Sequence, residues 1–181
     1  ESPLHIRLID EAARARSRVY PVLLRLTAGS QFGMDERDFF DALDRRADTP
    51  NIHIEGVHYF SGTQRKKLDS QRKELAMLAE LTQKLKTVYG FETVRVEYGP
   101  GLYFPYFNHE DHSDTLAPLR ELAPDLGALA ERCELTIEMG RFFASECGAY
   151  LTRVIDTKVN CGTAYAILDG GIHHVNYLGG N

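Results

Sequence analysis

Three short segments of the sequence combine glycine with side chains that can bind an anion or hold a proton: Ser61-Gly62-Thr63-Gln64, Gly99-Pro100-Gly101 and Glu138-Met139-Gly140-Arg141. Glycine lets backbone N–H groups approach an anion closely, and arginine can bind a phosphate through two parallel hydrogen bonds. Each segment is weak alone, because a lone Gly-x-Gly is more often a plain turn and a lone arginine a surface ion pair. Together they predict a phosphate site with one carboxylate, that of Glu138, beside it.

Each of these segments follows a stretch of sequence that is typical of a strand. The strands are expected at 52–60, 93–98 and 135–139 and helices at 64–88 and 113–132, the last interrupted at Pro118 or Pro124. Alternation of strands and helices predicts a parallel sheet with helices packed outside it. Ligands of such folds bind at the carboxyl ends of the strands, so the three segments are expected to meet at one edge of the sheet.

The two ends of the chain have different patterns. Ser2 and Pro3 are typical of a helix start, a strand is expected at 19–26, and Asp35 can cap a short helix that ends near Arg46. After Gly148 the helices stop, and two strands at 149–160 and 163–169 are separated only by Cys161-Gly162. This change predicts an α/β domain over residues 1–148 and the start of an all-β domain over residues 149–181.

Composition excludes several classes of protein. The 181 residues are 43% hydrophobic and 26% charged with a net charge of −5, which gives no basic surface for nucleic acid or an anionic membrane. No apolar stretch reaches the length of about 18 residues that a membrane span needs, and no signal peptide is expected. Three cysteines without a Cys-x-x-Cys spacing indicate reduced thiols, so we expect a cytoplasmic protein.

Other polar clusters have simpler interpretations. His109 and His112 could ligate a metal, but histidines three apart in a polar loop are more often a solvated turn, and the side chains of His173 and His174 diverge on a strand. No metal site is therefore expected. The basic residues 65–67 and 72–73 are interpreted as the exposed face of the long helix.

The motifs together resemble a known family, the fold-type III pyridoxal-phosphate-dependent amino-acid decarboxylases, which include the ornithine, diaminopimelate and arginine decarboxylases. The resemblance runs from end to end in the order of five motifs: Leu24-Arg25-Leu26 with Gln31-Phe32-Gly33, residues 56–64 (Gly-Val-His-Tyr-Phe-Ser-Gly-Thr-Gln), Gly99-Pro100-Gly101, Glu138-Met139-Gly140-Arg141 and Asp169-Gly170-Gly171. It implies a cofactor, pyridoxal 5'-phosphate, an amino-acid substrate and a homodimer.

The resemblance also implies roles for individual residues. Glu138 would face the pyridine nitrogen and keep it protonated, so that the ring can act as an electron sink. Phe60 would stack on the ring where the family has histidine, which keeps a flat face but removes a titratable group. The cofactor phosphate would be held by Arg141, Gly140, Gly101 and the hydroxyl of Thr63, and Arg25 would lie near the other ring substituents.

The implied fold is the C-terminal half of an alanine racemase-like (β/α)8 barrel followed by the first strands of the C-terminal β-domain. A complete barrel of this type needs about 250 residues. The family's Schiff-base lysine lies on the first barrel strand, and no lysine of this chain falls in such a motif. We therefore expect the chain to be an internal piece of a larger decarboxylase and to be inactive alone.

Two alternatives stay open. A related racemase would usually place arginine at the pyridine nitrogen, so Glu138 disfavours it. The second alternative is a non-catalytic homologue or regulatory partner subunit that kept the fold without the lysine. Phe60 followed by Ser-Gly-Thr-Gln resembles branches of the family that act on unusual or carrier-bound acidic amino acids, but the sequence does not identify the substrate.

Overall fold

The structure is a computed structural model that describes residues 1–107 and 109–174. It divides into two compact units, Glu1–Phe142 and Phe143–Asn181. The division lies close to residue 148, where the sequence pattern changes from α/β to all-β. The assignment of residues 1–148 and 149–181 to two domains stays a prediction.

The first unit is built on a parallel sheet of four strands in the order β1-β2-β3-β4. The strands are β1 (Tyr20–Arg25), β2 (Ile52–Phe60), β3 (Arg95–Gly99) and β4 (Glu134–Ile137). Each strand pairs with the next one along the chain, and every pair is parallel. The carboxyl ends of all four strands therefore lie at the same edge of the sheet.

Helices α2 (Glu36–Asp44), α3 (Asp69–Tyr89) and α4 (Ala117–Ala130) lie between consecutive strands of this sheet, and several helix ends are at the capping residues that the sequence indicates. The other helical segments of the chain are α1 (Pro3–Ala15), the short 3-10 helix η1 (Arg46–Asp48) and α5 (Gly140–Ala144). Ser2 caps α1 and Asp35 caps α2, because their side chains accept hydrogen bonds from backbone N–H groups three residues later. Gly90 ends α3 in the left-handed conformation that glycine adopts readily.

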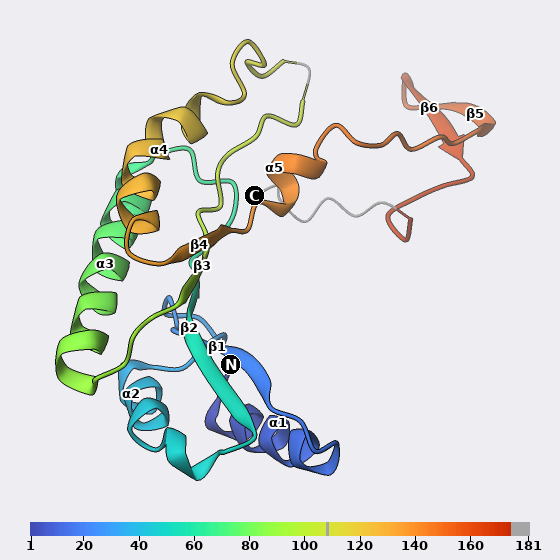
Figure 1. The fold of residues 1–181 in the computed structure, drawn as a ribbon. Coiled ribbons are helices and arrows are strands. Elements are labelled where there is room, and N and C mark those ends of the chain that lie inside the picture. Colours follow the sequence, from blue (N-terminus) through green and yellow to red (C-terminus); the bar gives the residue numbers. More distant parts are fainter. Residues whose placement is uncertain (108, 175–181) are drawn as a thin grey trace. The chain divides into compact units, whose positions relative to one another are not determined.

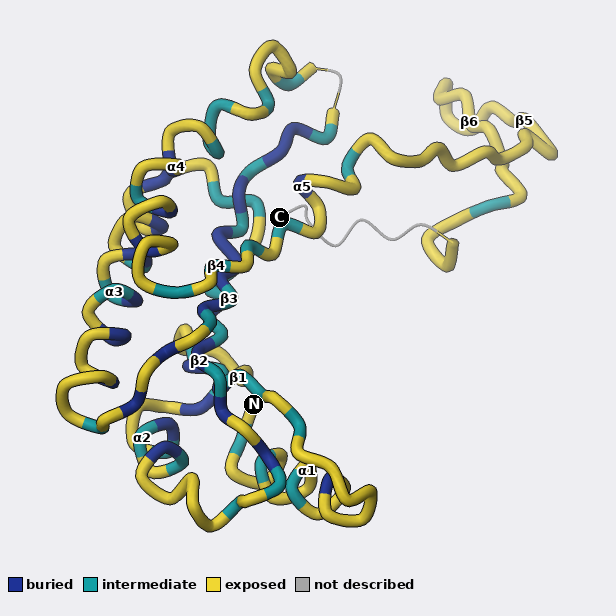
Figure 2. The backbone as a smooth tube through the Cα atoms, in the orientation of Figure 1, coloured by how far each residue is buried: buried dark blue, intermediate teal, exposed yellow. Residues whose placement is uncertain are grey.

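The core of the first unit lies between the sheet and helices α2, α3 and α4, which cover one face (Figure 1). Strand residues Val57, Val96 and Tyr98 are buried there. They pack with leucines of α3 and α4, and the buried residues line the inner sides of these helices (Figure 2). Because side chains alternate along a strand, the residues between them face the opposite side of the sheet.

Two helices differ from their predicted extents. Residues 64–68 are not helical, because Gln64 has a positive φ of 55° and Arg65 forms a bridge with Leu102. Helix α3 therefore begins at Asp69. Helix α4 is continuous, with Pro118 in its first turn, where a missing N–H costs nothing, and Pro124 inside it.

The second unit contains an antiparallel hairpin of β5 (Val154–Asn160) and β6 (Thr163–Leu168). Only Cys161 and Gly162 connect the two strands, as the sequence predicts. Both residues have positive φ values, 49° and 80°. A two-residue turn of this kind matches the twist of the strands that it joins.

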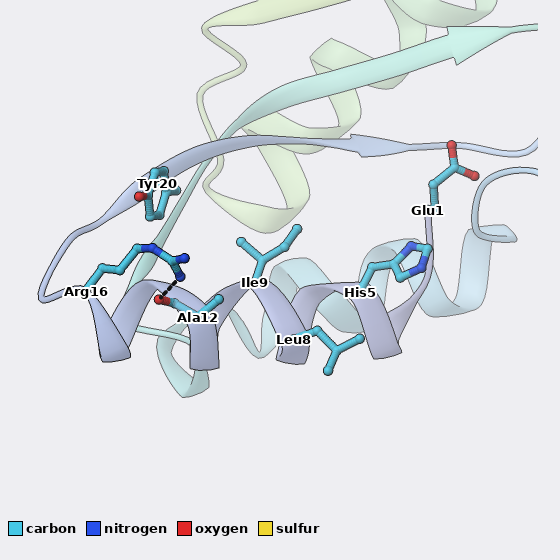
Figure 3. A pocket seen from close by; sticks show the side chains of 7 residues that line it. All are labelled: Glu1, His5, Leu8, Ile9, Ala12, Arg16 and Tyr20. Atoms are coloured by element: carbon cyan, nitrogen blue, oxygen red, sulfur yellow. Dashed lines mark hydrogen bonds between the residues drawn. The ribbon is translucent and has the colours of Figure 1, made fainter.

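Along α1 the first unit carries a groove that is lined by Leu8, Ile9 and Ala12 of the helix and by Tyr20 of β1 (Figure 3). The side chain of Arg16 closes one end and donates to the carbonyl oxygen of Ala12. None of the predicted cofactor residues lines this groove. Within the described residues, no helix combines the length and apolar character that a membrane span requires.

Candidate cofactor site

The face of the sheet opposite the helices carries polar residues in rows across the strands. Arg25 of β1 pairs in register with His58 of β2, and His58 pairs with Glu97 of β3. One step closer to the carboxyl ends, Phe60 pairs with Gly99. Residues in register on neighbouring strands point to the same side of the sheet. The predicted site residues Arg25 and Phe60 therefore share the open face.

The aromatic ring of Phe60 lies against Gly99. A Cβ atom built on Gly99 would be 2.3 Å from Cδ2 of Phe60, closer than any real contact of such an atom. Glycine at this position therefore leaves the space that the ring occupies. The guanidinium carbon of Arg25 is 6.0 Å from the centre of the Phe60 ring and 5.0 Å from that of Phe32.

Glu138 follows β4 directly, and its backbone N–H donates to the carbonyl oxygen of Tyr98, so the carboxylate stands at the carboxyl edge of the sheet. Its Oε2 atom lies 3.2 Å from Nε2 of His58. An imidazole partner for this carboxylate was not predicted from the sequence, because the two residues are far apart in the chain and meet only through the register of the sheet.

The loops after β2 and β3 pack against each other through two glycines. Gly101 has a φ of +58°, and a Cβ atom built on it would be 1.9 Å from the carbonyl oxygen of Gly62. The backbone N–H of Arg65 donates to the carbonyl oxygen of Gly101 over 2.9 Å. The predicted phosphate-binding residues Thr63 and Gly101 are thus brought together on adjacent loops.

Two glutamines hold these loops in place. The side chain of Gln64 donates to the carbonyl oxygen of Phe104 and accepts from its N–H, each over 2.9 Å. From the first turn of α3, buried Gln71 donates to the carbonyl oxygen of Pro100 over 3.2 Å. The amide group of Gln64 replaces a pair of backbone hydrogen bonds, so the loop after β3 is held almost as a strand would be.

Behind the loops lies a cluster of four hydrogen-bonded side chains. The guanidinium group of Arg65 binds both carboxylate oxygens of Glu74 on α3, over 2.8 and 3.0 Å. The hydroxyl groups of Ser61 and Tyr98 also donate to Glu74, over 2.8 and 2.7 Å. Sequence reasoning assigned Arg65 to the exposed face of a helix, and this was wrong. Its side chain is only 18% exposed, and it anchors the loop that carries Thr63.

Burial and the hydrogen bonds of this cluster shift the pKa values of Glu74 and Tyr98. Burial alone would raise the pKa of Glu74, but the hydrogen bonds from Arg65, Tyr98 and Ser61 outweigh it and hold that pKa below its ordinary value. Burial and the adjacent Glu74 raise the pKa of the Tyr98 hydroxyl. The carboxylate is therefore ionised at neutral pH and gives Ser61 and Arg65 a fixed acceptor.

The aromatic segment after Gly101 is organised around another carboxylate. Glu110 accepts from the hydroxyl of Tyr103 and from the backbone N–H groups of Tyr106 and Phe107, the latter two over 2.8 and 3.1 Å. These hydrogen bonds lower the pKa of Glu110 to about 2. Glu110 is therefore ionised at neutral pH and closes the segment into a turn.

Gly140 and Arg141 form the start of α5, immediately after Glu138. Both are exposed, while the next residue, Phe142, is buried and contacts the ring of Phe104 edge-to-face with centres 5.8 Å apart. Phe142 thus ties this turn to the loop after β3. Among the described residues, the structure shows no ion pair or hydrogen bond for the side chains of Arg141 and Thr63.

These residues fit the groups of pyridoxal phosphate. A dianionic phosphate requires N–H, hydroxyl and guanidinium donors, and these are offered by Thr63, Gly101, Gly140 and Arg141. A protonated pyridine nitrogen requires an acceptor, and Glu138 supplies a carboxylate. The flat ring requires an apolar face, and Phe60 presents one beside Gly99. Gly62 and Gly101 pack against each other without side chains, so backbone groups of both loops are accessible beside the phosphate position.

Comparison with known proteins gives the family. The sequence model of the family described as "Pyridoxal-dependent decarboxylase, pyridoxal binding domain" matches residues 5–145. The chain therefore belongs to the pyridoxal-dependent decarboxylases. Pyridoxal phosphate is the cofactor of this domain.

Curated relatives agree with this family. The chain is 28% identical over 148 residues to the L-glutamyl-[BtrI acyl-carrier protein] decarboxylase of Niallia circulans, covering 80% of this chain and 35% of that protein. It is 25% identical over 151 residues to the 2-[(L-alanin-3-ylcarbamoyl)methyl]-2-hydroxybutanedioate decarboxylase of Staphylococcus aureus, covering 78% and 36%. The chain thus spans about a third of the length of these relatives.

The fold agrees as well. The diaminopimelate decarboxylase of M. jannaschii superposes with a TM-score of 0.78 at 21% identity, over 94% of this chain and 44% of that one. The architecture is that of the TIM-barrel pyridoxal decarboxylases, of which the four-stranded parallel sheet forms part. The predicted fold class is confirmed.

Proposed function

We propose that the protein containing this chain removes CO2 from an amino acid with pyridoxal phosphate as cofactor. The observation that carries the proposal is the position of Glu138, a carboxylate at the carboxyl edge of the sheet, beside the two packed glycine loops. When bound, the cofactor supplies an electron sink for the electron pair that CO2 leaves behind. An acceptor such as Glu138 keeps that sink effective, because it stabilises the proton on the pyridine nitrogen.

The remaining site residues would bind and orient the cofactor. Phe60 would pack on one face of the ring, with Gly99 allowing its approach. Arg141, Gly140, Gly101 and Thr63 would hold the phosphate, and the guanidinium group of Arg25 would lie beside the ring. The Arg65–Glu74 pair would keep the loop of Thr63 in place. The roles of the cofactor-binding residues are supported by the matching motifs and by the strand ends that carry them, and the role of the Arg65–Glu74 pair by its hydrogen bonds.

An acidic or carrier-bound substrate is the more specific part of the proposal. The relatives from Niallia circulans and Staphylococcus aureus are named for a glutamyl group on a carrier protein and for a hydroxybutanedioate. The first name contains a carrier-bound glutamyl group, and the second contains a butanedioate, which is a dicarboxylate. We propose that the protein acts on an acidic or carrier-bound amino acid of this kind, as a cytoplasmic homodimer. The 181 residues alone, without a Schiff-base lysine motif, are proposed to be inactive.

The test uses the protein as its gene encodes it, together with the Glu138→Gln variant. Release of CO2 is measured by mass spectrometry over a panel of acidic, basic and carrier-bound amino acids. We expect turnover with an acidic member, and a fall of about 100-fold or more in Glu138→Gln, which loses the negative charge at the pyridine nitrogen. Glu11→Gln, an exposed change on α1, is the matched control.

Three results would contradict parts of this proposal. Interconversion of enantiomers without CO2 release would indicate a racemase. Binding of pyridoxal phosphate without turnover of any panel member would support a non-catalytic homologue. Equal activity of Glu138→Gln and Glu11→Gln would remove the role of Glu138.

A further inference from the structure

We propose that His58 is a positioning residue for Glu138: its Nε2–H group donates a hydrogen bond to one carboxylate oxygen and so directs the other oxygen to the pyridine nitrogen. The inference rests on the proposed function, because it assigns a purpose to a contact of the carboxylate that would face the cofactor. It adds a residue near the carboxyl end of β2, two positions before Phe60.

The contact between the two residues crosses a strand. His58 lies on β2 and Glu138 follows β4, and β3 separates these strands in the sheet. Strands are spaced about 4.8 Å apart, so the two backbones are about 10 Å from each other. Nevertheless Nε2 of His58 is 3.2 Å from Oε2 of Glu138. Both side chains must therefore extend toward each other over β3.

The chemistry of the pair fixes where the proton lies. An ionised carboxylate can only accept hydrogen bonds, so the imidazole must carry its hydrogen on Nε2. The bond occupies Oε2 of Glu138 and leaves Oε1 as the acceptor that is free for a second donor. A protonated pyridine nitrogen is such a donor, and it needs one oxygen.

The difference in burial between the two side chains indicates that His58 orients Glu138. The Glu138 side chain is 42% exposed, and His58 is its only hydrogen-bond partner among the described residues, whereas the side chain of His58 is 19% exposed. A half-exposed glutamate without a partner would sample several rotamers. The more buried imidazole holds it in one.

The neighbours of His58 do not compete for this role. Its register partner on β1, Arg25, is bound to the carboxylate of Glu1 over 2.6 Å. Its register partner on β3, Glu97, is a second acceptor on the same face, but the structure shows no hydrogen bond between the two. The imidazole is thus directed past β3 to Glu138.

The experiment compares variants whose side chains can or cannot replace the Nε2 donor. His58→Gln carries an amide NH2 at nearly the distance of Nε2, His58→Asn carries it one methylene shorter, and His58→Leu carries no donor. His53→Leu, at an exposed residue of the same strand, is the matched control. Each variant of the protein as its gene encodes it is loaded with pyridoxal phosphate that is labelled with 15N in the ring.

The nitrogen chemical shift reports the protonation of the ring independently of turnover. We expect His58→Leu and His58→Asn to move this shift toward the unprotonated form, and His58→Gln and His53→Leu to keep it. The value of kcat should fall about tenfold in His58→Leu, the effect of one hydrogen bond, with KM for the amino acid unchanged. In a Glu138→Ala background, His58→Leu should move the shift no further.

The outcomes separate this inference from the proposed function. If the bound cofactor has the same nitrogen chemical shift in His58→Leu as in the unchanged protein, the role of His58 is overturned. The decarboxylase proposal is not affected by that result. A protein that binds no pyridoxal phosphate overturns both. If His58→Leu does not fold, the contrast between His58→Gln and His58→Asn decides: equal shifts would contradict the inference.

Discussion

The α-carbon of Gly101 faces the carbonyl oxygen of Gly62 so closely that an added Cβ atom would lie 1.9 Å from that oxygen. The two residues belong to the loops after β3 and β2, and the N–H of Arg65 bonds to the carbonyl oxygen of Gly101 beside them. Because the loops touch backbone to backbone, a methyl group at Gly101 has to separate them.

Gly101→Ala is therefore expected to destabilise the protein more than its backbone conformation alone requires. Gly90 provides a matched control, because its φ of +57° equals that of Gly101 within a degree while its Cβ position is open. Gly90→Ala should cost about 1 kcal/mol for the left-handed conformation, and Gly101→Ala about 2 kcal/mol more. Urea unfolding measures both. An equal loss of unfolding free energy in the two variants would show that the contact between Gly101 and Gly62 does not contribute to stability.

Gly99→Ala should weaken cofactor binding. The added methyl group would lie 2.3 Å from Cδ2 of Phe60 and would therefore displace its ring. We expect a stability loss of about 1–2 kcal/mol from overpacking and a reduced affinity for pyridoxal phosphate. Gly127→Ala, in α4 with an open Cβ position, should instead gain up to about 1 kcal/mol and bind normally. Fluorescence titration with the cofactor compares the two variants, and unchanged affinity in Gly99→Ala would contradict the stacking role of Phe60.

Glu74→Gln should lower stability by about 2 kcal/mol at pH 7, since Arg65 would lose its charged partner in a largely buried place. The pKa of Glu74 is below its ordinary value in the folded protein. Its contribution is therefore complete above the unfolded pKa of about 4.3 and disappears as the pH falls through the lower folded value. The difference between the unchanged protein and Glu74→Gln should accordingly shrink below about pH 4.

Unfolding measured from pH 7 to pH 2 tests this expectation. The matched control is Glu80→Gln, an exposed change on the same helix, which should leave the unfolding free energy within about 0.5 kcal/mol. A pH-independent difference between Glu74→Gln and the unchanged protein would rule out the charge of Glu74 as the source.

Arg141→Ala should weaken binding of pyridoxal phosphate by about ten- to a hundredfold, the range for hydrogen bonds to a charged group. Binding of pyridoxal, which has the ring without the phosphate, should be unchanged. Arg37→Ala removes the same charge from an exposed residue of α2 and should affect neither ligand. If pyridoxal and its phosphate lose affinity equally, Arg141 does not act on the phosphate.

Local signals in the sequence predicted the regular elements well. Strand β2 has the predicted bounds, Ile52–Phe60, because its alternating apolar residues satisfy a sheet that is covered on one side. The caps at Ser2, Asp35 and Gly90 are in place because each depends on its own side chain or conformation and on nearby backbone. The order of three strand ends then predicted which residues would share an edge.

Contacts between distant segments were not predictable in this way. The left-handed Gln64 and the bridge of Arg65 to Leu102 exist because two loops pair with each other, and no local pattern records that pairing. Arg65 had the sequence context of a helix surface, but its partner Glu74 comes from α3, and Tyr98 of β3 donates to the same carboxylate. The approach of His58 to Glu138 likewise depends on the register of three strands.

The position of Glu74 has a consequence for the whole first unit. Glu74 lies on α3 near the buried residues Gln71 and Leu75, and its carboxylate accepts a hydrogen bond from Ser61 in the loop after β2. The order of this loop is therefore coupled to the formation of the helix. A ligand that binds only the ordered loop stabilises the helix by mass action. Mutations in the α3 core should therefore resemble loss of cofactor affinity, and an excess of pyridoxal phosphate should restore variants that have lost stability far from the site.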